Sequence, residues 1–338
     1  MIPSVRFRNW AYSLSVLPAL LVIAGNCNGS AWAWMNVVFS LGILALLESW
    51  LGDNASDEHS EFRDTLPKLL LWSHVALTAA MMVSLGYLIL YKSPMWVELT
   101  GAILSTGLAC GSGAVVVAHE LIHKADKASK WAGRGLLLLV GNPYFSAHHI
   151  LVHHVHVGTH DDCVTARKGE TLYQYIPRSI IGQYRQARKA EISLQQKKTG
   201  TATWAQSHLI QNVIVCLGIF SFLSLLQPLF AMAWLGVSAL AAALLEYVNY
   251  IEHYGLERHH ADRVGPLHSW NSNRSISRFL LFDLSRHADH HMHASKPYHC
   301  LESGLSSPQL PGGYVQLLYL AIRPSKWFKT VDPLLPNE

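Results

Sequence analysis

The chain has 338 residues, of which 50% are hydrophobic and only 14% are charged, and this balance is unusual for a water-soluble domain. The formal net charge is +4, but the sequence has no dense Lys/Arg face with interleaved aromatic residues, which argues against a nucleic-acid-binding protein. The five cysteines are scattered without a CxxC pair, so they predict neither a disulfide framework nor an iron–sulfur or rubredoxin-type site. If the protein carries out redox chemistry, its electrons are expected to come from another polypeptide.

Six apolar stretches follow one another along the chain, and a helix of about 20 residues crosses the hydrocarbon core of a bilayer. They lie at 10–25, 32–50, 67–91, 96–118, 209–227 and 230–250. The first stretch is short, contains Pro18 and follows Arg6 and Arg8, so a cleaved signal peptide is the alternative interpretation of it. We predict an all-α integral membrane protein with six transmembrane helices.

The links after the first, third and fifth apolar stretches are very short, whereas all long segments fall on the other side of the predicted membrane. Of the 26 Lys and Arg residues, 25 lie on the side of the long segments and only Lys92 lies opposite. By the positive-inside rule, the long segments face the cytoplasm. We expect 119–208 and 251–338 to pack together as a helical cytoplasmic cap, and the chain, 1–338, to form a single domain.

Nine of the 20 histidines form four groups that this topology places at one membrane face. His119 and His123 end the fourth apolar stretch with an i, i+4 spacing, which puts both rings on one face of a helix. The candidate metal ligands are His119, His123, His149, His153, His154, His253, His287, His290 and His291. Because four separate groups meet at one face, they indicate metal binding far more strongly than a single HxxxH motif does.

Nine ligands are too many for one ion and suit two. Imidazole binds iron, zinc and copper alike, so the ligand type leaves the metal open. Nearby carboxylates are expected to balance the charge and to orient the rings. The candidates for this outer layer are Glu120, Glu252, Asp289 and His268, followed by Asp161, Asp162 and Asp283, with solvated surface acids as the alternative for each carboxylate.

Several strings resemble motifs of the bacterial alkane 1-monooxygenases, within the membrane fatty acid desaturase and hydroxylase superfamily. The most specific string is Asn249-Tyr-Ile-Glu-His-Tyr-Gly255. The others are His119-Glu-Leu-Ile-His123-Lys124, His268-Ser-Trp-Asn-Ser-Asn273, Arg286-His-Ala-Asp-His-His291 and Leu310-Pro-Gly-Gly-Tyr314. The resemblance extends from about residue 40 to the C-terminus.

One region departs from the family's pattern, which usually has Glu-His-x-x-Gly-His-His and then Thr-Pro-Glu-Asp-Pro. This chain reads His148-His149-Ile-Leu-Val-His153-His154 and then Thr159-His-Asp-Asp-Cys163. The family's ligand histidines are still matched at His149, His153 and His154. The departure therefore bears on the substrate and on the surroundings of the metal more than on the metal site itself.

The resemblance implies a non-heme di-iron centre held by the nine histidines, with O2 as the oxidant. It implies terminal hydroxylation of a medium-chain alkane to a primary alcohol, with electrons from rubredoxin and its NAD(P)H-dependent rubredoxin reductase. The location it implies is the bacterial inner membrane, with the active site on the cytoplasmic side. An acidic electron carrier could dock at the basic residues Lys124, Lys127, Lys130, Arg185, Arg188 and Lys189, and a lipid-facing basic rim is the alternative.

The sequence identifies no substrate-binding residue. Bulky side chains such as Phe39, Trp50 and Trp72 are candidates for limiting the chain length of the substrate, although a Trp near a membrane end is more often an interface anchor.

Other functions remain open from the sequence. A fatty-acyl desaturase or an aryl-methyl (xylene-type) hydroxylase would use the same scaffold. A membrane zinc protease would use Glu120 of the HExxH string as its general base, but it leaves seven clustered histidines unexplained. A non-enzymatic metal carrier would place its ligands within the bilayer, whereas here they are predicted at its edge.

Overall fold

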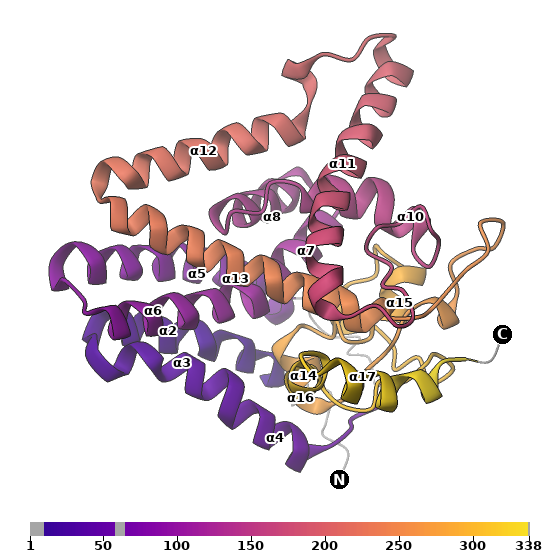
Figure 1. Ribbon diagram of the computed structural model, residues 1–338, viewed down its shortest axis with the longest axis horizontal. Helices are drawn as coiled ribbons and strands as arrows, with labels where there is room; N and C mark the ends of the chain where they lie inside the picture. Colours follow the sequence, from indigo (N-terminus) through magenta and orange to yellow (C-terminus); the bar gives the residue numbers. More distant parts are fainter. Residues whose placement is uncertain (1–9, 58–64, 337–338) are drawn as a thin grey trace.

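The computed structural model describes residues 10–57 and 65–336, and over these residues the protein is helical (Figure 1). The β-structure of this described part is limited to two isolated bridges, which join Asp53 to Arg274 and Asn271 to Gln309. The all-α fold class predicted from the sequence is therefore confirmed.

Five helical segments are long and apolar enough to cross a membrane. These spans are Ser30–Leu51, Thr65–Lys92, Trp96–Ile122, His208–Leu226 and Pro228–His253. The first contains α3 (Met35–Val37) and α4 (Leu44–Leu51), and the third contains α6 (Trp96–Ala109) and α7 (Val116–Ile122), in each case joined by a π-helical turn. The other three spans are α5, α12 and α13. They correspond to five of the six predicted stretches.

The remaining stretch, 10–25, falls in a shorter apolar helical segment, Tyr12–Asn28, whose main part is α2 (Val16–Asn28). This segment packs against α5, where Asn26 Nδ2 donates a hydrogen bond of 3.0 Å to Ser84 Oγ. Arg6 and Arg8, which suggested a signal peptide, lie outside the described residues. Length and composition thus support five spans, and the sixth helix is shorter than the others.

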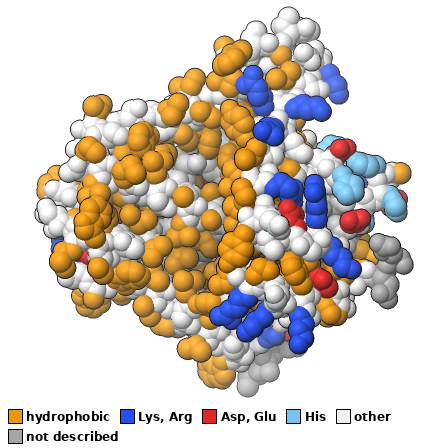
Figure 2. Space-filling model, viewed as in Figure 1, with side chains coloured by type: hydrophobic (Ala, Val, Ile, Leu, Met, Phe, Trp, Pro, Cys, Tyr) orange, Lys and Arg blue, Asp and Glu red, His pale blue; other side chains and the backbone are white. Residues whose placement is uncertain are grey.

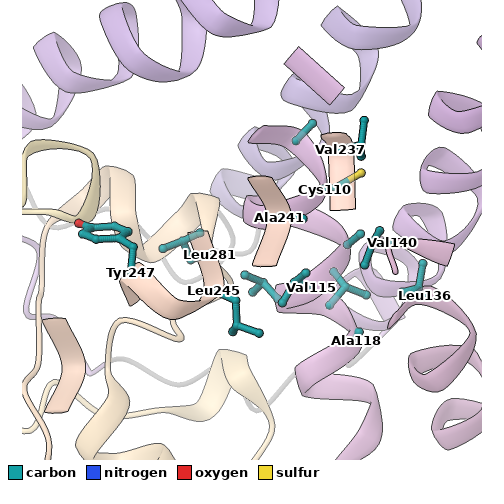
Figure 3. Packing of buried hydrophobic residues seen from close by; sticks show 14 of the residues in the cluster. Cys110, Val115, Ala118, Leu136, Val140, Val237, Ala241, Leu245, Tyr247 and Leu281 are labelled. Carbon is teal, nitrogen blue, oxygen red and sulfur yellow. The ribbon is translucent and has the colours of Figure 1, made fainter. Parts of the chain in front are cut away.

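The α6 helix and the π-helical turn after it, Cys110–Val115, cross α13 at close range. A Cβ atom added at Gly107 would stand 2.8 Å from Leu240 Cδ2, and one added at Gly111 would stand 2.7 Å from Leu244 Cδ1. Small residues allow membrane helices to approach this closely. Figure 3 shows buried side chains around this crossing, among them Cys110, Val115, Val237, Ala241 and Leu245.

The α8 helix (Lys127–Leu139) doubles back along the bundle after α7 instead of lying in a cap (Figure 1). Its far end meets α12 and α13, where Trp234 Nε1 donates to the Leu139 carbonyl at 2.8 Å and Asn212 Nδ2 donates to the Pro143 carbonyl at 2.9 Å. Trp234 precedes His253 on α13 by 19 residues, which is roughly 28 Å of helix. The prediction that 119–208 and 251–338 pack together as one cap is therefore not confirmed, since α8 lies against α12 and α13.

The other helices gather at the end of the bundle that holds the C-terminal ends of α7 and α13 (Figure 1). They are α9 (Phe145–His148), α10 (His154–His156), α11 (Leu172–Thr199), α14 (Ser275–Leu280), α15 (His287–Met292), α16 (Tyr314–Ala321) and α17 (Pro324–Val331). Figure 2 shows hydrophobic side chains over the bundle, a band of Lys and Arg beside them, and histidines beyond that band. The predicted metal ligands lie at this polar end.

Candidate metal centre

Four segments deliver the nine predicted histidines to one place. His119 and His123 stand at the C-terminal end of α7, and His253 ends α13. His149 and His153 come from a π-helical turn that leads into His154 of α10. His287, His290 and His291 make up half of the six-residue helix α15.

The π-helical turn His149–His153 directs the histidine rings of this segment toward the same side. In a regular α-helix, residues five apart such as His149 and His154 would differ by about 140° in direction. A π-helical turn closes its hydrogen bonds from i to i+5 and brings such residues to one side, and such turns are frequent at functional sites. The local geometry therefore suits a shared ligand.

The ring nitrogens form two groups, and within each group the nitrogens lie within 4.8 Å of one another. The five-histidine group is His119, His123, His149, His154 and His290, and the four-histidine group is His153, His253, His287 and His291. The two groups adjoin, because the ring centroids of His154 and His291 are 4.6 Å apart. The structure thus brings all nine predicted residues together.

The spacing of the nitrogens suits metal ions better than hydrogen bonds. His149 Nε2 lies 3.0 Å from both His123 Nε2 and His154 Nε2, and His287 Nε2 lies 3.1 Å from His253 Nε2 and 2.9 Å from His291 Nε2. Two nitrogens that bind one ion at about 2.1 Å and at right angles stand about 3.0 Å apart. A neutral imidazole nitrogen is either a donor or an acceptor, so one nitrogen facing two others is better satisfied by a shared cation.

Unpartnered nitrogens inside the two groups point to the same conclusion. His119 Nε2 and His290 Nε2 of the five-histidine group are buried without a hydrogen-bond partner, and so is His153 Nε2 of the four-histidine group. A buried polar atom without a partner is costly. The donor set therefore fits a pair of metal ions that would satisfy these atoms.

The histidines are held in the form that binds metals. Burial lowers the pKa of His149, His154, His287, His290 and His291 well below the usual value, and each pKa is lowered further by neighbouring histidines. Burial, together with the charge of Lys124, lowers the pKa of His123 to about 4. Neutral imidazole is the form of histidine that binds metal ions, so these rings already have the protonation state that metal binding requires.

Two carboxylates contact the rings. Asp162 Oδ2 lies 2.9 Å from His153 Nδ1, the outer nitrogen of that ring. Burial alone would raise the pKa of Asp162, but His153 and His148 bring it well below the usual range. Glu252 Oε2 lies 3.3 Å from His287 Nε2, an inner nitrogen of the four-histidine group. Asp162 was only a minor candidate from the sequence, whereas Glu252 was a leading one and stands closer to the centre than expected.

The other residues predicted for the outer layer have different partners. Glu120 forms an ion pair with Lys124, Asp289 Oδ1 lies 2.8 Å from His293 Nδ1 and its Oδ2 accepts from Lys296 Nζ at 2.8 Å, and His268 Nδ1 accepts from the backbone N–H of Gly265 at 2.9 Å. Of the minor candidates, Asp283 pairs with Arg278, and Asp161 lies near His260. These interactions brace the loops around the centre instead of orienting its nine rings.

A narrow apolar cavity ends at the histidines. One small cavity, of about 30 Å³, is lined by His119, His149, Glu252 and His287 together with apolar residues. A neighbouring apolar cavity of about 90 Å³ reaches toward the π-helical turn Val38–Ile43, α4, α14 and α16. Both cavities are lined by Gly111, Val116, Val248 and Leu284. The arrangement could hold an apolar chain with one end at the centre.

The bulky residues suggested from the sequence do not line this path. Trp50 is 81% exposed and Trp72 is 44% exposed, as befits side chains that face lipid. Phe39 is buried, but its neighbours Ser40 and Leu41 line the apolar cavity in its place.

Comparison with known proteins agrees with this site. The model of the fatty acid desaturase family matches residues 94–315. The chain is 33% identical to alkane 1-monooxygenase 2 of Pseudomonas aeruginosa over 97% of its own length and 91% of that protein. It is 31% identical to alkane 1-monooxygenase 2 of Alcanivorax borkumensis, over 96% of the chain and 88% of that protein. The hydroxylase component XylM of a Pseudomonas putida xylene/toluene monooxygenase is 26% identical over 69% of the chain and 63% of that protein. The chain therefore belongs to the alkane 1-monooxygenase family, within the fatty acid desaturase family.

Proposed function

We propose that this protein is a membrane monooxygenase that hydroxylates the terminal methyl group of a medium-chain alkane to a primary alcohol, with O2 as the oxidant and two iron ions as the cofactor. The observation that carries the proposal is the convergence of nine histidine nitrogens in two adjoining groups at the end of an apolar cavity. We further propose that these nine histidines are the iron ligands. When bound, the iron ions would supply the oxygen-activating redox chemistry.

The chain's own residues have separable roles in this proposal. Apolar walls at Val116, Val248 and Leu284 would hold the alkyl chain and exclude water. Tyr314 donates a hydrogen bond to Glu252, which keeps this carboxylate at the inner edge of the four-histidine group. Asp162 would hold the ring of His153 in one orientation, as carboxylates do for metal-bound histidines.

The proposal assigns electron delivery to rubredoxin, supplied in turn by its reductase. A cleft of about 1040 Å³ opens beside the four-histidine group, with Arg167, Arg185 and Arg258 among its lining residues. The Arg258 guanidinium donates to backbone carbonyls of Val155, Val157 and Asp262, and these contacts leave its charge available to an acidic protein. Asp162, which also lines the cleft, touches His153. Electrostatic complementarity of this kind favours fast association.

The proposed setting is the bacterial inner membrane, with the metal centre on the cytoplasmic side and the chain forming one domain. The segment Tyr12–Asn28 has 17 residues, which is near the lower limit of about 17 residues for a membrane crossing. We propose it as a sixth span. The support for the orientation is the concentration of Lys and Arg residues near the histidine end.

A direct test combines metal analysis of the purified protein with an assay on octane, O2, rubredoxin and its reductase. The expected result is two iron ions per chain and 1-octanol as the product. Zinc in place of iron, or no product from octane under these conditions, would contradict the proposal.

A second candidate function is aryl-methyl hydroxylation, which the similarity to XylM supports. Both reactions need a methyl group at the end of the cavity, and they differ in the width of the substrate. A comparison of turnover on octane and on xylene separates the two, and faster turnover of xylene would favour the second candidate.

A further inference from the structure

A third cluster of metal-binding side chains lies outside the nine histidines. It consists of His148, Asp162 and Cys163, whose ligand atoms all lie within 4.8 Å of one another. His148 is 1% exposed and Asp162 is 3% exposed, so two of the three are buried. Neither His148 nor Cys163 is among the metal ligands predicted from the sequence.

The cluster is accessible because it stands at the wall of the 1040 Å³ cleft, which both Asp162 and Cys163 line. Gln186 of α11 contacts two members of the cluster. Its Oε1 lies 3.0 Å from His148 Nε2 and accepts a hydrogen bond from the Cys163 backbone N–H at 3.3 Å. An ion entering from the cleft would meet Asp162, Cys163 and Gln186 at the cleft wall, and the buried His148 stands directly behind them.

The distances suit a four-coordinate ion. Cys163 Sγ lies 3.6 Å from His148 Nε2. For a tetrahedral ion with about 2.3 Å to sulfur and about 2.0 Å to nitrogen, the separation of the two ligand atoms is about 3.5 Å, close to this distance. His148 Nε2 and Asp162 Oδ1 are 4.0 Å apart, so the carboxylate would have to move inward by roughly half an ångström.

The present hydrogen bonds of the cluster would not prevent such binding. The thiol of Cys163 has the Ser179 carbonyl as an acceptor only at 3.7 Å, which is a weak interaction for sulfur. Asp162 directs Oδ2 to His153 and leaves Oδ1 with the backbone N–H of Val164 at 3.0 Å. One oxygen of this carboxylate therefore faces the nine-histidine centre and the other faces the cluster.

We propose that His148, Asp162 and Cys163 form a separate binding site for a borderline-soft divalent cation of the zinc class, with Gln186 or a water molecule as the fourth ligand. A thiolate with an imidazole and a carboxylate selects such an ion over magnesium or calcium. Binding releases the thiol proton to the solvent of the cleft, so the sulfur enters the site as a thiolate and no electron is transferred.

The carboxylate of Asp162 belongs to the proposed cation site and also contacts His153, so binding of a cation is expected to affect the nine-histidine centre. Because Asp162 contacts His153 through its other oxygen, an ion that draws Asp162 inward changes the support of that ring. Occupancy of the site is therefore expected to slow turnover, while the protein without added zinc-class ions works normally.

The experiment is a titration of the iron-loaded protein with Co²⁺, followed by thiolate-to-cobalt absorption in the near ultraviolet, with iron content measured before and after. One equivalent of Co²⁺ should produce the band without loss of iron. Cys163→Ala should abolish the band, whereas Cys27→Ala, at an exposed cysteine, should leave the band unchanged. Activity assays with added Zn²⁺ should show inhibition that Cys163→Ala relieves by at least about tenfold in the inhibitory concentration.

Absence of the band in the unsubstituted protein, or its persistence in Cys163→Ala, would overturn the proposal. If Cys163→Ala fails to fold, Cys163→Ser keeps the volume and replaces the soft sulfur by oxygen, and the band must then be absent. Since the readout is binding of cobalt, its result is independent of which hydrocarbon the enzyme oxidises.

Discussion

Tyr314 of α16 donates a hydrogen bond of 2.6 Å to Glu252 of α13, although the two residues are 62 positions apart in the chain. The other oxygen of Glu252 lies 3.3 Å from His287 Nε2. The Tyr314–Glu252 hydrogen bond links the Leu310–Tyr314 and Asn249–Gly255 strings, which are far apart in the sequence. It holds the Glu252 carboxylate beside the cavity in which the methyl end of the substrate is proposed to lie.

Removal of this donor gives the first prediction. Tyr314→Phe leaves a buried oxygen of Glu252 without its partner, which should cost about 1–3 kcal/mol of folding stability and lower the turnover number. Thermal unfolding and steady-state kinetics on octane check both effects. Tyr173→Phe is the matched control, since its hydroxyl donates to the Ile322 carbonyl at an exposed site; equal losses in the two variants would contradict a special role for Tyr314.

Truncation of a proposed ligand is the second prediction. His253→Ala removes a ring whose Nε2 lies 3.1 Å from His287 Nε2, so the protein should lose part of its iron and all measurable turnover. Iron content by elemental analysis and 1-octanol formation are the measurements. His293→Ala, at a side chain that is 59% exposed, should keep both. Retained iron and activity in His253→Ala would remove that residue from the ligand set.

The third prediction concerns the carboxylate behind His153. Asp162→Asn keeps the shape of the side chain but removes the charge that faces His153 Nδ1 at 2.9 Å. Changes to such supporting groups typically cost about 10–100-fold in metal affinity or activity, and a loss in this range is expected here. Asp161→Asn, at an exposed carboxylate, should have little effect. Iron affinity measured by competition with a chelator distinguishes the two variants.

Chain-length selectivity provides the fourth prediction. Gly111 lines both apolar cavities, and a Cβ there would stand 2.7 Å from Leu244 Cδ1. Gly111→Ala should therefore narrow the path and shift the preferred substrate toward shorter alkanes, as seen in relative turnover across a series of chain lengths. Gly218→Ala on α12, where a Cβ would meet nothing within 4 Å, is the control. An unchanged preference in Gly111→Ala would show that the substrate takes another path.

The sequence predicted the elements whose signal is local. Apolar stretches of membrane length identified the five spans, and histidine spacing together with the membrane topology gathered the nine rings at one end. The i, i+4 pair of His119 and His123 needed only helical geometry. These features follow from residues that are neighbours in the chain.

The parts that the sequence did not reveal depend on distant contacts. The first part of α8 is polar, with Lys127, Lys130 and Arg134, so the average hydropathy of the segment did not indicate a helix packed against the bundle. The apolar last part of the helix contacts α12 and α13. The π-helical turn at His149–His153 was also unexpected, although the spacing of His149, His153 and His154 is the signal that such a turn would explain. Asp162 gained its importance only through its contact with His153, which no periodicity predicts.

Because α8 turns back along the bundle, its position affects the order in which the protein can fold during synthesis and membrane insertion. The carbonyl of Leu139, at the end of α8, accepts from Trp234, and the carbonyl of Pro143, just after the helix, accepts from Asn212. Backbone groups at membrane depth must find such partners within the protein. Both donors follow α8 in the chain, so these two carbonyls gain their hydrogen-bond partners only after α12 and α13 have been synthesised. His253, His287, His290 and His291 come later in the chain than the histidines of α7 and α10, so the proposed metal ions would find their full set of ligands only near the end of synthesis.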